Sequence, residues 1–503
     1  MSKNEKNEKY LHILFGFTLF IILLFLSLNK IEGDFYHIFN SGKWIVEHKV
    51  LPYENYEFVL PGYKTVIQQW LYSVMLYGSA QFGYAGVALF TLIQAAILLS
   101  MFYKLARTLG CNKTSGFIAA SLSLWVFLEY INCRPQMITV ILLLAGIMTI
   151  ERYRISGNSK LLYLLPLFTL IEANVHVTCA LFHLVIILPY AVPFVIKKYN
   201  IDIRRTDLII PSLLSVGTMF INPYGVKGVL CVFFTADELA SSVTELRSPE
   251  LMSVYGTYMA LSIILLFFLY RKNKLNSVVI WFVLGFGFLQ VVSARNSIFL
   301  SIAVCYEAAL LFDVSGIKIL DFFDKIRFSL DKLMFIVMYT MYAMAGCFVV
   351  FLHVDSFVHN NDLEYNITDI YLEGLGDCID HLKENSDTEN IKVFTEFNMG
   401  ARFVYNDIDH IYMQTKSEPY CEYVNEKENL MTEYIDIVTS HSDEYVDAFL
   451  DKYDFDYLCV TKRSSFLYCY LVRSAEYKQV VGPDEGSLYD CYLFERVGCA
   501  YDS

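Results

Sequence analysis

Long apolar runs separated by short polar connections fill the first 354 residues of this chain. A helix that crosses about 30 Å of hydrocarbon needs roughly 20 mainly apolar residues. Eleven runs approach or meet that length, at residues 10–28, 84–106, 114–131, 135–150, 161–175, 177–196, 207–221, 256–270, 277–293, 296–312 and 333–353. The pattern therefore predicts a polytopic α-helical membrane protein with about eleven transmembrane helices.

Residues 355–503 show a different pattern, because they have no long apolar run and carry frequent Tyr and Asp. Short apolar strands are predicted near 392–397, 410–415, 457–462, 477–481 and 489–496. Helices are predicted near 370–385, 428–439 and 443–453. We therefore expect two domains, a transmembrane domain over 1–354 and an α/β domain over 355–503.

Composition and charge sharpen this division. The chain is 55% hydrophobic and only 18% charged, with a mean hydropathy of +0.42, whereas soluble proteins carry about 25% charged residues. Residues 1–354 have a formal charge of +7, and residues 355–503 have one of −20. An acidic domain of this kind is no nucleic-acid binder on electrostatic grounds.

The Lys and Arg residues also predict the orientation. If the N-terminus is cytoplasmic, the inner connections hold 20 Lys and Arg residues and the outer ones hold 8. Basic residues are retained on the cytoplasmic side, so we expect a multi-pass plasma-membrane protein with an extracytoplasmic C-terminal domain. The first helix, 10–28, lacks a small-residue cleavage site after it and is expected to stay as an anchor. Six cysteines fall in the external domain, where disulfides could form.

Polar and ionisable side chains gather in the connections that are predicted to be outer. Groups of this kind at helix ends often face a water-filled cavity. The connections are Gly33-Asp34-Phe35-Tyr36-His37, Asn132-Cys133-Arg134-Pro135, Glu172-Ala173-Asn174-Val175-His176, Asn222-Pro223-Tyr224-Gly225 with Thr244 to Pro249, and Ser293-Ala294-Arg295-Asn296. Each polar residue in these connections has a simpler explanation, because it can cap a helix, form a turn or lie at the membrane interface. Together the connections supply an acid, a base and a cation at one depth in the membrane.

Other chemistries find little support in the sequence. It contains no phosphate-binding Gly-x-x-x-x-Gly-Lys-Ser/Thr loop, no His-Glu-x-x-His, no Cys-x-x-Cys and no Gly-x-Ser-x-Gly. Two alternatives stay open, a transporter or flippase of lipid-linked saccharides and a non-catalytic surface assembly protein. Transporters usually show paired halves with midplane sites, and no internal repeat is evident here.

The chain resembles the bacterial multi-spanning membrane glycosyltransferases of the GT-C class over most of its length. The Gly-Asp, aromatic and His pattern after the first helix is matched by Gly33, Asp34, Tyr36 and His37. An Asn-x-His turn ends at His176, and an Arg opens a late helix at Arg295. Further matching residues are Gly42, Pro52, Pro61, Gly62, Trp70, Leu71, Asn174, Asn222 to Gly225 and Glu245 to Pro249.

This resemblance implies transfer of a hexosyl or pentosyl group, with inversion, from a polyprenyl-phosphate carrier to an acceptor on the outer membrane face. The acceptor would be a cell-surface glycan, lipid or protein. Asp34 would be the catalytic base, and Arg295 would hold the leaving phosphate, with His176 and Arg134 as weaker candidates. Substrate contacts are further expected from His37, Asn174, Asn222, Tyr224 and Glu245. No cofactor is firmly implied, although a divalent cation beside Asp34 and His37 is compatible with the class.

Overall fold

The structure is a computed structural model that divides into two compact units. The helical unit comprises Met1–Lys30, Ser79–Val229 and Thr244–Asn366. The α/β unit comprises Ile31–Gly78, Leu230–Val243 and Ile367–Ser503. The residues that the structure describes are 3–29, 34–49, 53–54, 57–60, 64–231, 233, 247–250, 252–312, 340–341, 344, 348, 372, 374–416, 418–421, 429–483, 486 and 490–498.

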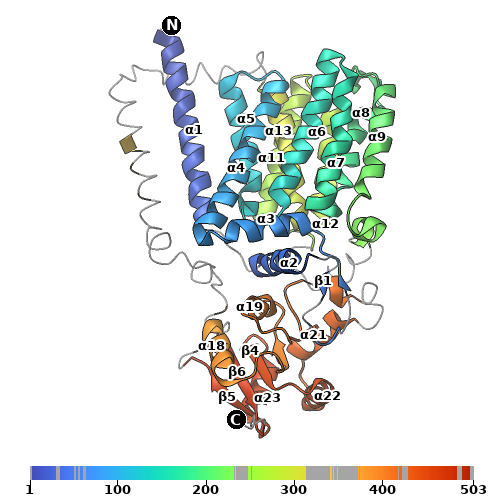
Figure 1. The fold of residues 1–503 in the computed structure, drawn as a ribbon. Coiled ribbons are helices and arrows are strands. Elements are labelled where there is room, and N and C mark those ends of the chain that lie inside the picture. The colour runs from blue at the N-terminus through green and yellow to red at the C-terminus, as the bar shows by residue number, and fades with distance from the viewer. Residues whose placement is uncertain are drawn as a thin grey trace. The chain divides into compact units, whose positions relative to one another are not determined.

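The helical unit is a bundle of roughly parallel and antiparallel helices (Figure 1). Its longer helices are α1 (Lys3–Asn29), α4 (Gly83–Thr108), α5 (Lys113–Phe127), α6 (Gln136–Ser156), α7 (Leu164–Val175), α8 (Phe182–Ala191), α9 (Thr206–Met219), α11 (Val254–Arg271), α12 (Ser277–Val292) and α13 (Ser297–Leu311). Short 3₁₀ turns lie between several of them: η1 (Leu128–Tyr130), η2 (Ser159–Tyr163), η3 (Val177–Cys179), η4 (Lys197–Tyr199) and η6 (Ala294–Asn296).

Helix α13 forms the centre of the bundle and packs against α4, α5, α6, α11 and α12. Almost all of its residues are buried, because its sequence is apolar or small on every face. A helix that is apolar all round lies in a protein core or spans a membrane. Its one carboxylate, Glu307, is buried and accepts a hydrogen bond of 2.8 Å from the Ser262 hydroxyl of α11.

Helices occupy ten of the eleven predicted spans, and the eleventh, 333–353, lies almost entirely outside the described residues. Among the residues that the structure describes, three helical segments are long and apolar enough to cross a membrane, namely Gly83–Thr108, Val254–Arg271 and Ala294–Leu311. Shorter apolar helices cover Gly16–Leu28, Val177–Ala191, Thr206–Met219 and Ser277–Val292. The membrane character of the fold is thus confirmed, whereas the number of crossings stays a prediction.

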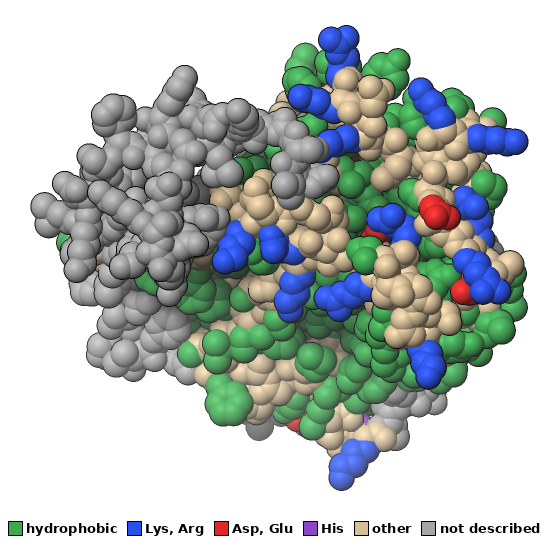
Figure 2. Space-filling model, turned by 90° about the horizontal axis from the view of Figure 1, so that it is seen from above, with side chains coloured by type: hydrophobic (Ala, Val, Ile, Leu, Met, Phe, Trp, Pro, Cys, Tyr) green, Lys and Arg blue, Asp and Glu red, His purple; other side chains and the backbone are tan. Residues whose placement is uncertain are grey.

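Lys and Arg side chains are spread over one end of the helical unit, with few Asp and Glu among them (Figure 2). The connections from α4 to α5, α6 to α7, α8 to α9 and α11 to α12 lie at this end (Figure 1). They carry Lys104, Arg107, Lys113, Arg152, Arg154, Lys160, Lys197, Lys198, Arg204, Arg205, Arg271, Lys272 and Lys274. These are the connections predicted to be cytoplasmic, so the distribution agrees with that orientation, which stays a prediction.

The α/β unit contains a four-stranded sheet in the order β3-β4-β6-β5. Strands β3 (Val393–Thr395) and β4 (Tyr457–Thr461) are parallel, while β6 (Cys491–Arg496) runs antiparallel to β4 and to β5 (Tyr477–Val481). The accompanying helices are α18 (Leu375–Asn385), α19 (Gly400–Tyr405), α21 (Leu430–Val438), α22 (Asp443–Tyr453) and α23 (Ser465–Arg473), with a 3₁₀ turn η7 (Glu418–Tyr420). The predicted α/β class of the C-terminal region is confirmed.

One predicted strand is wrong. Residues 410–415 form no strand, and Ile411 makes only isolated bridges to Glu57 and Val393. Beside β3, the Val393 amide donates to the His410 carbonyl at 3.0 Å and the Tyr412 amide donates to the Val393 carbonyl at 2.9 Å, and the carbonyl of Met413 accepts a hydrogen bond of 2.6 Å from the Thr395 hydroxyl. The close approach of this segment to α19 requires Gly400, because a Cβ there would lie 1.9 Å from the Met413 oxygen. Helices α19 and α23 are elements that the sequence pattern did not predict.

The segment 31–78 belongs to the α/β unit, although it precedes that unit's sheet by hundreds of residues. It forms α2 (Asp34–His48), the short antiparallel strands β1 (Tyr53–Glu54) and β2 (Lys64–Thr65), and most of α3 (Trp70–Ala80). Helix α2 packs on α19, where the Asn40 amide donates a 2.8 Å hydrogen bond to the Ala401 carbonyl. The predicted division at residue 354 did not anticipate this pairing, and the boundary itself lies outside the described residues.

A buried polar group fixes the segment around Glu57 to the rest of the α/β unit. The Glu57 carboxylate accepts hydrogen bonds of 2.6 Å from the Tyr420 hydroxyl and 2.8 Å from the Gln414 amide. The ammonium of Lys416, also buried, donates to the Val66 carbonyl. Burial raises the pKa of Glu57, although both hydrogen bonds act in the opposite direction.

The cysteines that the structure describes are all free thiols. Cys378, Cys421, Cys459 and Cys491 are buried in the α/β unit, and Cys469 is exposed. Cys499, the sixth cysteine of the predicted external domain, lies outside the described residues. Disulfide bonds are therefore not found within the described part of this domain.

Candidate functional site

Asp34, the predicted catalytic base, is the first residue of α2 and is half-buried. The N–H groups at a helix N-terminus favour a carboxylate at this position. His37 follows one turn later, with its Nε2 atom 3.2 Å from the amide nitrogen of Gln69. Both residues belong to the α/β unit, and their approach to the predicted residues of the helical unit stays a prediction.

Two of the predicted motifs meet in the helical unit through Asn174. Its side-chain amide, in the last turn of α7, donates hydrogen bonds of 2.9 Å to the carbonyls of Leu170 and Ile221. The second bond reaches the residue just before Asn222. It therefore ties the Asn-x-His turn to the Asn-Pro-Tyr-Gly turn, although 47 residues separate the two bonded positions.

Asn222 uses its own side chain to build that second turn. Its oxygen accepts a 2.9 Å hydrogen bond from the Tyr224 amide, and its amide donates to the carbonyls of Met219 and Gly225 at 3.0 and 3.2 Å. This arrangement is an Asx turn, in which the side chain replaces a backbone partner. Asn222 thus acts as a structural residue here and positions the half-buried Tyr224.

The turn that carries Arg295 is tied to two further connections. The Tyr130 hydroxyl donates to the Ala294 carbonyl at 3.1 Å and lies 3.0 Å from the Ser297 hydroxyl. The Ala294 amide in turn donates to the Arg247 carbonyl at 3.0 Å. These bonds join the Arg295 turn to η1, whose Tyr130 precedes Arg134 by four residues. They also join it to Arg247, in the part of the segment 244–249 that the structure describes. Glu245 itself lies outside the described residues.

His176 lies at the centre of a buried polar cluster. The Thr139 hydroxyl of α6 is 2.6 Å from a carboxylate oxygen of Glu172 and 3.0 Å from the His176 Nδ1 atom. The Cys179 sulfur lies 3.9 Å from the Nε2 atom of the same ring. Arg295 is half-buried and near enough for its positive charge to act on both His176 and Cys179.

The structure thus brings together His176 and Arg295, and it joins Asn174 to the turn that holds Asn222 and Tyr224. Arg134 lies half-buried in the bend between η1 and α6. Asp34 and His37 share one helix turn of the other unit. Hydrogen bonds link the described connections within the helical unit, and the outer-face cluster of five connections stays a prediction.

Three members of the buried cluster were not among the predicted site residues: Thr139, Glu172 and Cys179. A signal for two of them was present, because positions 172, 176 and 179 follow the i, i+4, i+7 spacing of a single helix face. Considered alone, Glu172 and Cys179 are single residues in apolar helices, and neither indicates a polar cluster. Thr139 comes from another helix, and no local pattern connects it with them.

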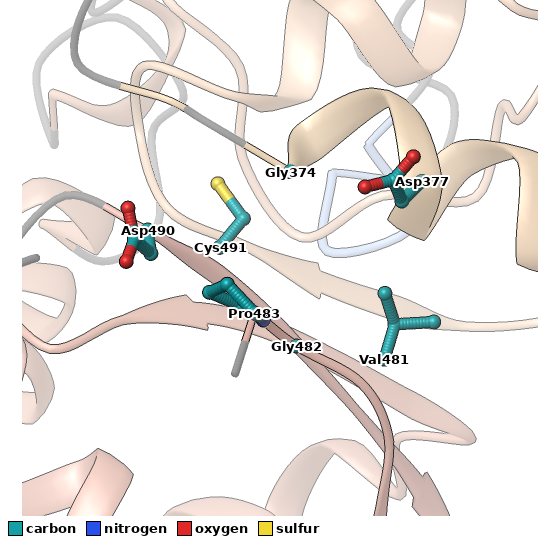
Figure 3. Close-up of a pocket in the computed structure, with 7 residues that line it drawn as sticks. All are labelled: Gly374, Asp377, Val481, Gly482, Pro483, Asp490 and Cys491. Atoms are coloured by element: carbon teal, nitrogen blue, oxygen red, sulfur yellow. The ribbon is translucent and has the colours of Figure 1, made fainter. Parts of the chain in front are cut away.

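A pocket of about 280 Å³ lies in the α/β unit, apart from all the predicted site residues. It is lined by Gly374, Asp377, Val481, Gly482, Pro483, Asp490 and Cys491, from α18 and the ends of β5 and β6. Figure 3 shows Asp377 and Asp490 on opposite sides of it. Two carboxylates in a small pocket identify no ligand by themselves.

Comparison with known proteins places the fold. No family model matches the chain, and no curated protein matches it by sequence. Its structure is similar to crystal structures of the oligosaccharyltransferase of Archaeoglobus fulgidus. One, tethered with an acceptor peptide containing the NVT sequon via a disulfide bond, has a TM-score of 0.59 and 10% identity, over 92% of this chain and 71% of that one. Another, a complex with Zn and sulfate, has a TM-score of 0.58 and 11% identity, over 92% and 70%.

The likeness defines a fold class. Over 92% of this chain, the fold is similar to that of the oligosaccharyltransferase structure. At an identity of 10 to 11% this similarity concerns the fold, and the activity has to be argued from the residues of this chain.

Proposed function

We propose that this protein is an integral membrane glycosyltransferase of the GT-C class, which moves a sugar from a polyprenyl-phosphate carrier to an acceptor on the outer membrane face. The observation that carries the proposal is the buried cluster around His176, on which the charge of Arg295 acts, in a turn that a hydrogen bond joins to the Asn222 turn, within a fold similar to that of an oligosaccharyltransferase over 92% of the chain. The acceptor is a cell-surface glycan, lipid or protein.

Asp34 is the proposed catalytic base. An acceptor hydroxyl is a weak nucleophile, and a carboxylate within hydrogen-bonding reach can orient it and accept its proton as the new bond forms. The half-buried position of Asp34 at the start of α2 suits this role, because the helix N-terminus stabilises the ionised form that a base requires. Attack from the face opposite the leaving phosphate would invert the anomeric centre of the hexosyl or pentosyl group.

Arg295 is the proposed partner of the leaving phosphate. Negative charge develops on the phosphate oxygens as the bond to the sugar breaks, and a guanidinium can hold two of these oxygens at once. Hydrogen bonds from the Tyr130 hydroxyl and to the Arg247 carbonyl fix the backbone of Ala294, next to Arg295. The backbone that presents the guanidinium is therefore held in position. Arg134 and Glu245 are proposed to contact donor or acceptor from neighbouring connections.

Asn174 and Asn222 are proposed to act through the turns that they build, with Tyr224 presented to substrate by the second turn. His37 is proposed to support Asp34 from one helix turn away. A divalent cation bound at this pair would help to neutralise a phosphate. Asp34 and His37 lie three residues apart on α2 and thus on one face, which is a geometry that two ligands of one ion can share.

The competing functions gain no support from these observations. A flippase for lipid-linked saccharides would share the many helices, but the linked polar groups here lie in connections at helix ends rather than at broken helices near the middle of the bundle. A non-catalytic assembly protein would give no reason for a buried cluster of Glu, His, Cys and Arg in the helical unit.

Mass spectrometry of lipid-linked sugars and of cell-surface glycans, in cells with and without the protein, tests the proposal. We expect one lipid-linked sugar to accumulate, and one glycan, glycolipid or glycoprotein to lose a sugar residue, when the protein is absent. Unchanged profiles in both fractions would contradict the proposal. Loss of a lipid-linked sugar from one side of the membrane, with no change in any acceptor, would favour the flippase instead.

A further inference from the structure

We propose that the helical unit contains a zinc site formed by Glu172, His176 and Cys179. The carboxylate, imidazole and thiol atoms that could bind a metal all lie within 4.8 Å of one another. All three residues are buried, with 0%, 9% and 8% of their surface exposed. The site shares His176 with the cluster that supports the proposed sugar transfer, but zinc binding is measured without any transfer assay, and the site differs from the pair Asp34 and His37.

The local backbone explains why the three ligands converge. Helix α7 ends at Val175, and His176 adopts an extended conformation (φ −156°, ψ 76°) before the 3₁₀ turn η3 begins at Val177. The His176 amide still donates to the Glu172 carbonyl at 2.7 Å, and the Cys179 amide donates to the His176 carbonyl at 2.9 Å. The chain therefore stays coiled through the break and keeps the three side chains on the same side.

Thr139 places His176 in the tautomer that binds metals. A hydroxyl has one hydrogen to donate, and a carboxylate can only accept, so the Thr139 hydrogen goes to Glu172 at 2.6 Å. The hydroxyl oxygen then accepts the N–H of the His176 Nδ1 atom at 3.0 Å. The Nε2 atom is left with a lone pair on the side of the ring that faces the Cys179 sulfur, 3.9 Å away. Second-sphere partners fix imidazole ligands in the same manner in known metal sites.

Charge favours occupancy by a dication. One oxygen of Glu172, Oε2, has no hydrogen-bond partner among the residues that the structure describes. Taking an ionised carboxylate out of water costs several kcal/mol unless a cation or sufficient hydrogen bonds compensate. A carboxylate and a thiolate would together neutralise a doubly charged ion, with the imidazole as a neutral third ligand. Arg295 would leave the occupied site with one net positive charge.

The ligand types select the metal. Magnesium and calcium prefer oxygen ligands only, whereas a thiolate and an imidazole suit zinc and its borderline neighbours. Zinc takes Cys, His and Glu ligands together in tetrahedral geometry, and three protein ligands leave a fourth position for water or an anion. The structure thus assigns a zinc-type site with one open position.

The test uses the full-length protein, purified in detergent, stripped with a chelator and then dialysed against Zn²⁺. Elemental analysis of the wild type should give about one zinc per chain. Replacing Zn²⁺ with Co²⁺ should produce the near-ultraviolet sulfur-to-cobalt absorption of a thiolate ligand, which needs no variant. A wild-type protein that binds no zinc, or binds cobalt without that absorption, would overturn the proposal.

Single variants separate the three ligands from other buried groups. Glu172→Gln, His176→Gln and Cys179→Ala should each lower zinc affinity at least tenfold, and Cys179→Ala should also remove the sulfur-to-cobalt absorption. His183→Gln is the matched control, because His183 is also a buried histidine, seven residues further along in α8, and lies outside the group of three. Loss of zinc in the control, or retention of full affinity in all three variants with monodisperse protein, would overturn the assignment.

Discussion

The side-chain amide of Asn174 donates a hydrogen bond of 2.9 Å to the backbone carbonyl of Ile221. This bond joins the end of α7 to the turn that follows α9, two helices that pack together along the bundle. The same amide caps α7 by bonding the Leu170 carbonyl. One side chain thereby fixes the positions of His176 on one side and of Tyr224 on the other.

Asn174→Ala removes both bonds and should loosen the second turn. A hydrogen bond contributes about 1 kcal/mol net, so we expect a loss of up to about 2 kcal/mol and faster hydrogen exchange at residues 221–231. Sugar transfer should fall in parallel. Asn158→Ala, which removes a comparable side-chain cap at the opposite end of the bundle, serves as the control and should leave exchange at 221–231 unchanged. Equal exchange in both variants would refute the role given to Asn174.

Arg295→Lys should show whether a guanidinium is needed. A lysine keeps the charge but offers a single ammonium in place of a planar fork. Loss of one donor to a developing oxyanion costs roughly 10²- to 10³-fold in kcat. We therefore expect a fall of that order for Arg295→Ala and a smaller one for Arg295→Lys, in a kinetic assay with lipid-linked donor. Arg271→Ala, at the opposite connection, should leave kcat unaltered; a similar loss there would mean that the effect is general.

The orientation can be tested with a reporter fused after Asp355. The +7 charge of residues 1–354 is concentrated in the connections at one end of the bundle, and that end should be retained in the cytoplasm. We expect an enzyme that is active only outside the cytoplasm to work at this fusion point, and one that is active only inside to fail. The opposite pair of signals would reverse the orientation and remove the outer-face site.

Glu57 should make the stability of the α/β unit depend on pH. Burial raises its folded-state pKa above the ordinary 4.5, so the folded protein holds this proton more tightly than the unfolded chain. The stabilisation is fully present below pH 4.5 and is lost as the pH rises through the folded-state value, by about 1.4 kcal/mol for each pKa unit of difference.

Glu57→Gln should therefore flatten the dependence of thermal stability on pH above pH 4.5, because the amide keeps an acceptor oxygen for Tyr420 and Gln414 and does not titrate. Glu389→Gln, at an exposed position of the same unit, is the control and should follow the wild type. A steep dependence that survives in the Glu57 variant would assign the effect to another group.

The spacing of apolar and capping residues correctly predicted elements whose bounds depend on neighbouring residues in the sequence. Helix α22 begins at Asp443 and ends at Tyr453 as predicted, since Ser442 caps it and apolar residues recur at helical spacing. Strand β5 likewise spans the predicted residues 477–481. Ile411, in contrast, lies in a segment that was predicted to be a strand but forms only isolated bridges, to Glu57 and Val393. The apolar pattern around residue 411 does not show which distant residues it pairs with.

In the candidate site, too, contacts between residues distant in sequence could not be predicted. His176 and Arg295 were predicted from polar residues at helix ends, and their proximity could not be read from a separation of more than a hundred residues. The contribution of Thr139 depends on how α6 packs against α7, which only the tertiary structure reveals. Assignment of the segment 31–78 to the α/β unit was missed for the same reason, because the bond from Asn40 to Ala401 spans 361 residues.

The central claim is that Asp34 activates an acceptor for transfer of a lipid-linked sugar, and it is tested most directly with purified protein in liposomes. The liposomes contain lipid extract from the native membrane, and mass spectrometry follows the polyprenyl-phosphate sugar and the acceptor together. Wild-type protein should consume the donor and glycosylate the acceptor, while Asp34→Asn, folded and inserted normally, should leave both unchanged. Wild-type turnover in the Asp34→Asn variant would contradict the account.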